Sequence, residues 1–149
     1  MNISDSFGIS SSALTAQRLR MDVISSNIAN AETTRAKIVD GKAVPYRRKT
    51  VVMAPKEMDF DSALNSAMGK DVSSQGVKIT KIQEDPSPLK PVYNPTHPDA
   101  DSEGYVYMPN VDILKEMVDM ISATRSYEAN VTALNASKAM FTKALQIGK

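Results

Sequence analysis

The sequence contains no cysteine and no tryptophan, and it has a single histidine among its 149 residues. Without cysteine the chain can form no disulfide and has no thiolate chemistry. Aromatic residues are limited to three Phe and five Tyr, so a large compact core is not expected to be the main source of stability. The net charge of +1 gives no electrostatic argument for binding nucleic acid or an anionic membrane.

The first twenty residues also lack the basic start and unbroken apolar core of a cleavable secretory signal. No window approaches the ~18 consecutive apolar residues of a membrane-spanning helix. We therefore expect no membrane span. We expect a chain that stays inside the cell or leaves it by a route that needs no such signal.

The single histidine, His97, stands in the segment THPDAD, residues 96–101. With Asp99, Asp101 and Glu103 it could hold a divalent metal in a hydrolase, because imidazole and carboxylate groups are common metal ligands. The favoured alternative is that His97 and Asp99 bond main-chain groups of their own loop. No phosphate-binding glycine loop, nucleophile elbow or pair of catalytic carboxylates is recognisable. The sequence therefore predicts no enzyme, no cofactor and no metal site.

The longest uninterrupted pattern is residues 110–147, which contain no proline or glycine. A helix of this length would extend ~55 Å. Pro109 prevents an earlier start, and Asn110 is a favourable N-cap. Apolar positions alternate at spacings of three and four, which predicts a heptad seam weakened at Thr124 and Lys138. The seam comprises Met117, Met120, Tyr127, Val131, Leu134, Phe141 and Leu145, and Val111, Leu114, Val118 and Ile121 widen its N-terminal end.

The other faces of this expected helix carry little charge. Between Met120 and Thr142 only Arg125, Glu128 and Lys138 are charged, and Ala, Ser, Thr and Asn fill most of the remaining positions. A helix face in water normally carries more charge. We infer contacts on several sides, more than one partner helix can supply. The alternative is an ordinary two-helix hairpin whose weakly charged surface contacts no other molecule.

Residues 6–31 form the second expected long helix. Its apolar positions recur every seven residues, with an addition at Ile24: Phe7, Leu14, Met21 and Ile28. Its only charged residues are Arg18, Arg20 and Asp22. Asn27 and Asn30, near its end, can bond nearby main-chain groups and so end the helix.

The two ends of the chain thus share heptad spacing and low charge, whereas residues 32–108 do not. This symmetry predicts that the two helices pair as an antiparallel coiled coil. The low-charge faces left over would be ordered by neighbouring molecules, as in folding coupled to assembly.

The middle of the chain is expected to be β-rich. Strands are predicted over Tyr46–Met53, Gly76–Ile82 and Gly104–Met108. Asp40-Gly41 indicates a hairpin turn within Lys37–Val44. A short helix is predicted over residues 59–68, with Phe60, Leu64 and Met68 on one face. Five prolines make residues 85–98 extended and turn-rich, and the basic run Arg47–Lys49 is expected to be a solvated strand face.

The expected fold class is therefore α+β, with long N- and C-terminal helices and a small β-rich middle module. We expect residues 1–35 and 109–149 to form a helical core. Residues 36–108 would form an outer β-rich module with loops.

Several stretches resemble the flagellar axial proteins that build the rod and hook. SNIANAETTR (residues 26–35) is similar to the signature that follows their first helix. HPDAD (residues 97–101) and GYVYMPNVDILKEMVDMISATRSYEANV (residues 104–131) strongly resemble a proximal-rod member, as do FGISSSALTAQRLRMDVISSNIAN and YRRKTVVM. One departure is Glu32-Thr33-Thr34, where many axial proteins have Asn-Thr-Pro.

The resemblance implies a structural subunit of the proximal rod in the bacterial flagellar basal body. Such a subunit polymerises through its terminal helices and transmits torque from rotor to hook, on the extracytoplasmic side of the inner membrane. Implied partners are other copies of the chain, the rod proteins FlgB, FlgF and FlgG, the basal protein FliE, the rod cap and the flagellar type III export apparatus, which needs no cleavable signal. The alternative is a soluble adaptor whose coiled coil binds one partner helix.

These interpretations predict two groups of functional residues. The expected assembly interface consists of Phe7, Leu14, Met21, Ile24, Asn27, Ile28, Asn30, Val111, Leu114, Met117, Ile121, Tyr127, Val131, Leu134, Phe141 and Leu145. The expected channel-lining or inter-subunit ion pairs involve Arg18, Arg20, Asp22, Arg125 and Glu128.

Overall fold

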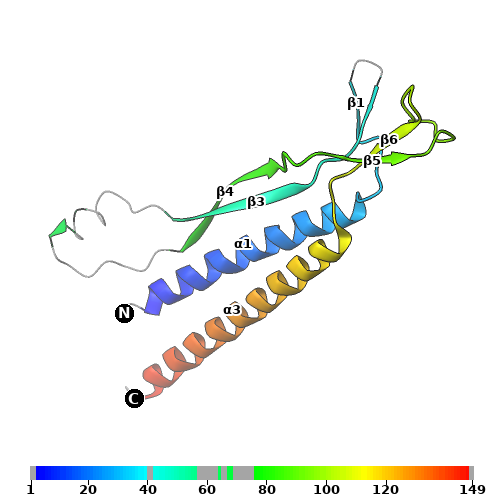
Figure 1. The fold of residues 1–149 in the computed structure, drawn as a ribbon. Helices are drawn as coiled ribbons and strands as arrows, with labels where there is room; N and C mark the ends of the chain where they lie inside the picture. Colours follow the sequence, from blue (N-terminus) through cyan, green and yellow to red (C-terminus); the bar gives the residue numbers. More distant parts are fainter. Residues whose placement is uncertain (1–2, 40–41, 57–63, 65–66, 69–75, 148–149) are drawn as a thin grey trace. The chain divides into compact units, whose positions relative to one another are not determined.

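The computed structural model describes residues 3–39, 42–56, 64, 67–68 and 76–147. Two long helices and several short strands confirm the α+β class (Figure 1). The elements are α1 (Ile3–Ala29), β1 (Lys37–Val39), β2 (Lys42–Val44), β3 (Lys49–Pro55), β4 (Val77–Glu84), β5 (Lys90–Tyr93), β6 (Tyr105–Met108) and α3 (Ile113–Ile147). The predicted Asp40-Gly41 turn and most of the predicted helix over residues 59–68, including Phe60, lie outside the described residues.

The chain divides into two compact units. The first comprises residues 1–19, 52–81 and 122–149. The second comprises residues 20–51 and 82–121. Each unit therefore contains part of both long helices and part of strands β3 and β4, and the second also contains the four remaining strands.

The long C-terminal helix begins at Ile113, so the predicted start at Asn110 is wrong. Asp112 is the N-cap: its Oδ1 accepts hydrogen bonds from the main-chain N of Leu114 (3.1 Å) and of Lys115 (3.4 Å). The Asn110 side chain is engaged elsewhere, because its Oδ1 accepts a bond from the main-chain N of Arg48 at 2.8 Å. A carboxylate at this end of the helix also suits the helix dipole.

The strands form three two-stranded sheets, β1–β2, β3–β4 and β5–β6. The predicted hairpin within residues 37–44 is confirmed, with Lys37 opposite Val44. In the second unit β5 lies beside β6 (Figure 1), with Tyr93 opposite Tyr105 and the two rings in an edge contact at 5.4 Å between centroids. Gly104 adopts φ +82° directly before β6, and a Cβ there would lie 3.0 Å from the Tyr93 ring.

Few side chains are fully buried. Among the described residues, the buried apolar ones are Ala16, Val23, Ile24, Pro45, Tyr46, Val106, Pro109, Val111 and Ala123, and the buried polar ones are Ser10, Asn27 and Glu116. On α3 the deepest positions are Glu116 and Ala123, each one residue before a predicted seam position. Met117, by contrast, is 50% exposed. The buried face of this part of α3 therefore lies one residue before the predicted seam. An acid and an alanine occupy it in place of the predicted seam residues.

Within the residues that the structure describes, no helix is both long enough and apolar enough to span a membrane.

Candidate functional site

The most completely bonded polar side chain in the second unit is Asn27, in the last turns of α1 and 1% exposed. Its Nδ2 donates to the main-chain O of Lys49 (2.8 Å) and to Oε2 of Glu116 (3.0 Å). Its Oδ1 accepts from the main-chain N of Lys49 (2.9 Å) and from the Tyr46 hydroxyl (3.0 Å). The two donors and two acceptor positions of the amide are all used. The predicted role of Asn27 as a local helix breaker is therefore wrong.

Glu116 is the acidic partner of Asn27 and is fully buried in the first turn of α3. Its second oxygen, Oε1, accepts a 2.6 Å hydrogen bond from Nε of Arg48. A buried carboxylate is unfavourable unless it is paired and hydrogen-bonded, and both oxygens of Glu116 meet that condition. A charge-assisted bond to guanidinium is among the stronger hydrogen bonds in proteins.

Arg48 connects this carboxylate to two others. Its Nη1 lies 3.3 Å from Oδ2 of Asp85, and its Nη2 lies 3.5 Å from Oδ2 of Asp119. Burial alone would lower the pKa of Arg48, but the hydrogen bonds and charges of Glu116 and Asp85 outweigh it and raise that pKa. Asp119 also pairs with Arg20 of α1 at 3.5 Å.

Main-chain groups complete the cluster. Asp85 donates its main-chain N to the O of Arg48 (2.8 Å). The side chain and main chain of Ser87, and then Arg48, lower the pKa of the Asp85 carboxyl. Asn110 donates to the main-chain O of Asp85 (3.3 Å) and of Ser87 (3.2 Å). We call the set of Asn27, Tyr46, Arg48, Asp85, Asn110, Glu116 and Asp119 the polar junction.

A second cluster surrounds the single histidine. The carboxylate of Asp99 accepts from Thr34 Oγ1 at 3.0 Å and from the guanidinium of Arg35. Arg35 in particular lowers the pKa of Asp99. Nδ1 of His97 accepts from the main-chain N of Asp99 at 3.1 Å, which agrees with the local-loop interpretation of His97. Across the described part of the chain, no group of three or more His, Cys, Asp or Glu side chains could hold a metal ion.

The first unit contains a smaller contact between α1 and a strand. The hydroxyl of Ser12 donates to the main-chain O of Ile9 (2.7 Å) and accepts from the main-chain N of Val77 (3.1 Å), the first residue of β4. Gly76 lies directly against this hydroxyl, since a Cβ on Gly76 would be 2.3 Å from Ser12 Oγ. The approach of the strand to the helix therefore depends on a position without a side chain.

The structure places the predicted interface residues at three depths. Buried are Ile24, Asn27 and Val111; half-buried are Phe7, Leu14, Met21, Ile28, Asn30, Tyr127, Val131 and Leu134; exposed are Leu114, Met117, Ile121, Phe141 and Leu145. Asn30 bonds locally as predicted, through Nδ2 to the main-chain O of Ser26 at 2.9 Å. The exposed members remain available to other molecules, and the role of the whole set in assembly stays a prediction.

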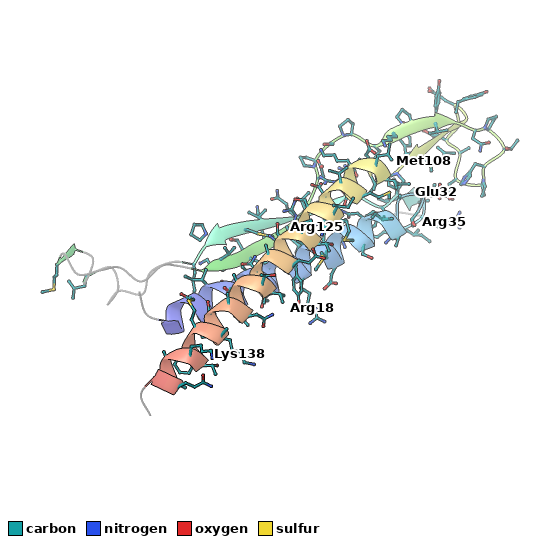
Figure 2. The ribbon with its side chains drawn as sticks, turned by 90° about the horizontal axis from the view of Figure 1, so that it is seen from below. Arg18, Glu32, Arg35, Met108, Arg125 and Lys138 are labelled. Carbon is teal, nitrogen blue, oxygen red and sulfur yellow. The ribbon has the colours of Figure 1, made fainter. Side chains whose placement is uncertain are left out.

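The residues predicted to form ion pairs differ in their partners and in their exposure. Arg20 pairs with Asp119, as described above. Arg125 pairs with Glu128 three residues later at 2.9 Å, and both side chains are exposed. Arg18 on α1 and Asp22 are also exposed, and Figure 2 shows where Arg18 and Arg125 leave their helices. An exposed pair such as Arg125–Glu128 contributes at most ~1 kcal/mol.

Sequence reasoning missed most of the polar junction. The basic run at residues 47–49 was expected to be solvated, yet the Arg48 side chain is only 16% exposed, so that prediction is wrong for Arg48. The available signal was Glu116, an acid seven residues before Ala123 and therefore on the same face of α3. Arg48 and Glu116 lie 68 residues apart in sequence, so no local spacing could have paired them.

Comparison with known proteins identifies the class of this chain. A family model described as flagella basal body rod protein matches residues 8–37, and one described as flagellar basal body rod FlgEFG protein C-terminal matches residues 102–147. The two matched segments contain Asn27 and Glu116, respectively. The two terminal segments of the chain are thus similar to those of flagellar basal-body rod proteins.

The relatives define the family more narrowly. The chain is 62% identical over 145 residues to the flagellar basal-body rod protein FlgC of Bacillus subtilis (strain 168), covering 97% of both chains. It is 46% identical over 158 residues to FlgC of Borreliella burgdorferi, covering 99% of this chain and 98% of that protein. It is 45% identical over 143 residues to FlgC of Escherichia coli O157:H7, covering 96% of both. The chain belongs to the FlgC family of flagellar basal-body rod proteins.

Membership of this family confirms the principal functional prediction. The chain has a structural role in the rod of the flagellar basal body. The prediction that it is not an enzyme agrees with that family.

Proposed function

We propose that the chain polymerises into the rod through its two terminal helices and passes torque along the rod from rotor to hook. The observation that carries this proposal is an exposed apolar face on the first turns of α3. Leu114, Met117, Val118 and Ile121 are 76%, 50%, 65% and 61% exposed. Their spacing of three and four places them on one side of the helix.

Such a face favours association. Burying the remaining exposed surface of each side chain against a neighbouring subunit would contribute at most about 1.5–3 kcal/mol. A contiguous exposed apolar patch on a helix is typical of an interaction surface. Met117 suits contacts with non-identical neighbours, because its unbranched side chain adapts to different surroundings.

We further propose that α1 and α3 pair in antiparallel directions as the helical core of the subunit. Two contacts within the second unit support this pairing. Arg20 faces Asp119, and Asn27 faces Glu116, so a higher number on α1 meets a lower number on α3. In this proposal residues 1–35 and 109–149 form the polymerising core, and residues 36–108 form the outer module.

The proposed partners are other copies of this chain, FlgB, FlgF and FlgG along the rod, and FliE at its base. The chain would reach the rod through the flagellar export apparatus, with assembly assisted by the rod cap. The predicted interface residues that are exposed, including Phe141 and Leu145, are the candidates for these contacts.

Substitution of Val118 and Ile121 by Asp tests the proposal. Each variant would replace the wild-type gene in a flagellated strain deleted for its own copy. Because both side chains are exposed, we expect the purified variants to unfold at nearly the wild-type temperature. We expect export to continue, whereas rods fail to assemble and swimming is lost.

Lys115→Asp is the control, since it introduces a carboxylate at an exposed position of the same helix without removing an apolar side chain. Its change in net charge is larger than that of the test variants, so normal swimming would show that added negative charge alone does not block assembly. Normal rods and swimming in both Val118→Asp and Ile121→Asp would contradict the proposal. A stable one-to-one complex with another protein, together with absence from purified basal bodies, would favour the adaptor alternative instead.

A further inference from the structure

We infer that Asn27, Arg48 and Glu116 set the register of α1 against α3, so that these helices meet in one alignment only. The inference rests on the proposed pairing of the two helices. It concerns three side chains of the polar junction, whose bonds join α1, the start of β3 and the first turn of α3. Apolar contacts alone would specify this alignment weakly, because aliphatic side chains pack against many neighbours at similar energy.

The orientation of Asn27 is fixed by its partners. The Oδ1 atom must face the main-chain N of Lys49 and the Tyr46 hydroxyl, and the Nδ2 atom must face the main-chain O of Lys49. The remaining Nδ2 hydrogen then points to Glu116. A flip of the amide would place donor against donor and acceptor against acceptor at Lys49.

The side chain at position 116 must therefore offer two acceptor oxygens. Oε2 faces the Asn27 amide donor at 3.0 Å, and Oε1 faces the Arg48 donor at 2.6 Å. A glutamine at this position has the same shape but only one acceptor oxygen. Its amide group would face a donor of either Asn27 or Arg48. The cluster thus requires a carboxylate for reasons of hydrogen bonding as well as charge.

A change of register would break these bonds together. Sliding one helix by a single turn moves its side chains by about 5.4 Å, well beyond hydrogen-bond reach. If α3 slides, Glu116, which is fully buried, loses both Asn27 and Arg48, and one hydrogen of the buried Asn27 amide loses its acceptor. A buried polar residue that fixes the register of paired helices is a known use of such groups.

Apolar residues of similar size should replace the three side chains without unfolding the protein. The groups left behind keep other partners: Tyr46 has the Ser26 hydroxyl at 3.4 Å, Asp85 has Ser87, and Asp119 has Arg20. Lys49 itself is an exposed residue. Replacement of a buried ion pair by apolar residues of similar volume is often neutral for stability.

The decisive variant is therefore Asn27→Leu with Arg48→Met and Glu116→Met. Spin labels are attached at Ser25→Cys and Lys115→Cys, both exposed, in a chain that has no other cysteine. We expect a single narrow distance distribution in the parent protein. In the triple variant we expect a broader distribution or one whose mean is displaced by at most about 5 Å, the length of one helical turn, with the melting temperature nearly unchanged. A distribution as narrow as that of the parent, at the same distance, would overturn the inference.

Glu116→Gln keeps the inference testable if the triple variant does not fold. We expect this single change to broaden the label distances, whereas Glu128→Gln, at an exposed acid of the same helix, leaves them unchanged. Equal distributions in both variants would refute the role of Glu116. Because the distances are measured on the purified chain, loss of register and loss of rod assembly are separate results, and swimming assays report the second alone.

Discussion

Helix α1 bonds the first residue of a strand in each unit, and the two contacts are built differently. In the second unit Asn27 bonds the main-chain N and O of Lys49, where β3 begins. In the first unit Ser12 accepts from the main-chain N of Val77, where β4 begins. Both side chains satisfy the main chain at the point where strand pairing starts.

The difference lies in what surrounds the two contacts. Asn27 is buried and donates to Glu116, which in turn accepts from Arg48. The stability of this contact therefore depends on hydrogen bonding and charge. The Ser12 hydroxyl bonds main-chain groups of Ile9 and Val77, and its approach to β4 depends on the absence of a side chain at Gly76. One contact should therefore be sensitive to polarity and pH, and the other to shape.

The largest effect is expected for Glu116→Ala. It removes the acceptor of Arg48 and Asn27 and leaves both groups partly unpaired in a buried setting. We expect a loss of about 3 kcal/mol in the free energy of unfolding. Urea unfolding followed by circular dichroism measures this loss. Glu128→Ala, which removes an exposed acid from the same helix, should change the free energy by no more than about 0.5 kcal/mol.

Gly76→Ala should have the next largest effect. The new methyl group would displace the Ser12 hydroxyl and weaken its bond to Val77. We expect a loss of about 1–3 kcal/mol in the free energy of unfolding, as for other overpacked sites. Hydrogen exchange at the Val77 amide reports on this bond and should become faster in the variant. Unchanged or slower exchange at that amide would contradict this account.

Gly8→Ala is the matched control for that change. Nothing lies within 4 Å of a Cβ at Gly8, which sits inside α1. The substitution should therefore stabilise the protein by about 0.5–1 kcal/mol through helix propensity. Opposite signs for the two Gly→Ala changes would establish that shape, and not loss of glycine flexibility, decides the effect at Gly76.

Acid should weaken the polar junction before it affects the Ser12 contact. The pKa of Asp85 is lowered by Ser87 and Arg48, so its ionised form stabilises the folded state. That contribution is complete above the ordinary pKa of 3.8 and is lost as the pH falls through the lowered value. We expect Asp85→Asn to reduce the slope of unfolding free energy against pH below about pH 4. An unchanged slope would show that Asp85 contributes no pH dependence.

The long helices and most strands followed from sequence because their signals are local. The absence of proline and glycine over residues 110–147 indicated α3, alternating apolar and polar residues indicated β4, and the segment GYVYM before Pro109 indicated β6. The start of α3 was misplaced because Asn110 and Asp112 are both good N-caps, and only tertiary contacts show that Asn110 bonds Arg48 instead.

The candidate site was less predictable than the fold. The expected seam assumed that apolar side chains face inward, whereas Glu116 and Ala123 occupy the deepest positions of α3. Arg48 was interpreted from its basic neighbours as a solvated residue. Its partners Asp85, Glu116 and Asp119 come from two distant segments, so their charges meet only after the chain has folded.

The hydrogen bond between Asn27 and Glu116 also constrains the order in which the chain folds. It joins residues 89 positions apart, whereas the bond from Asn27 to Lys49 spans 22. Closing a loop about four times longer costs roughly 1.2 kcal/mol more in chain entropy, or two doublings at ~0.6 kcal/mol each. We therefore expect the contact with Lys49 to form before the contact with Glu116 whenever the chain folds, because it closes the shorter loop.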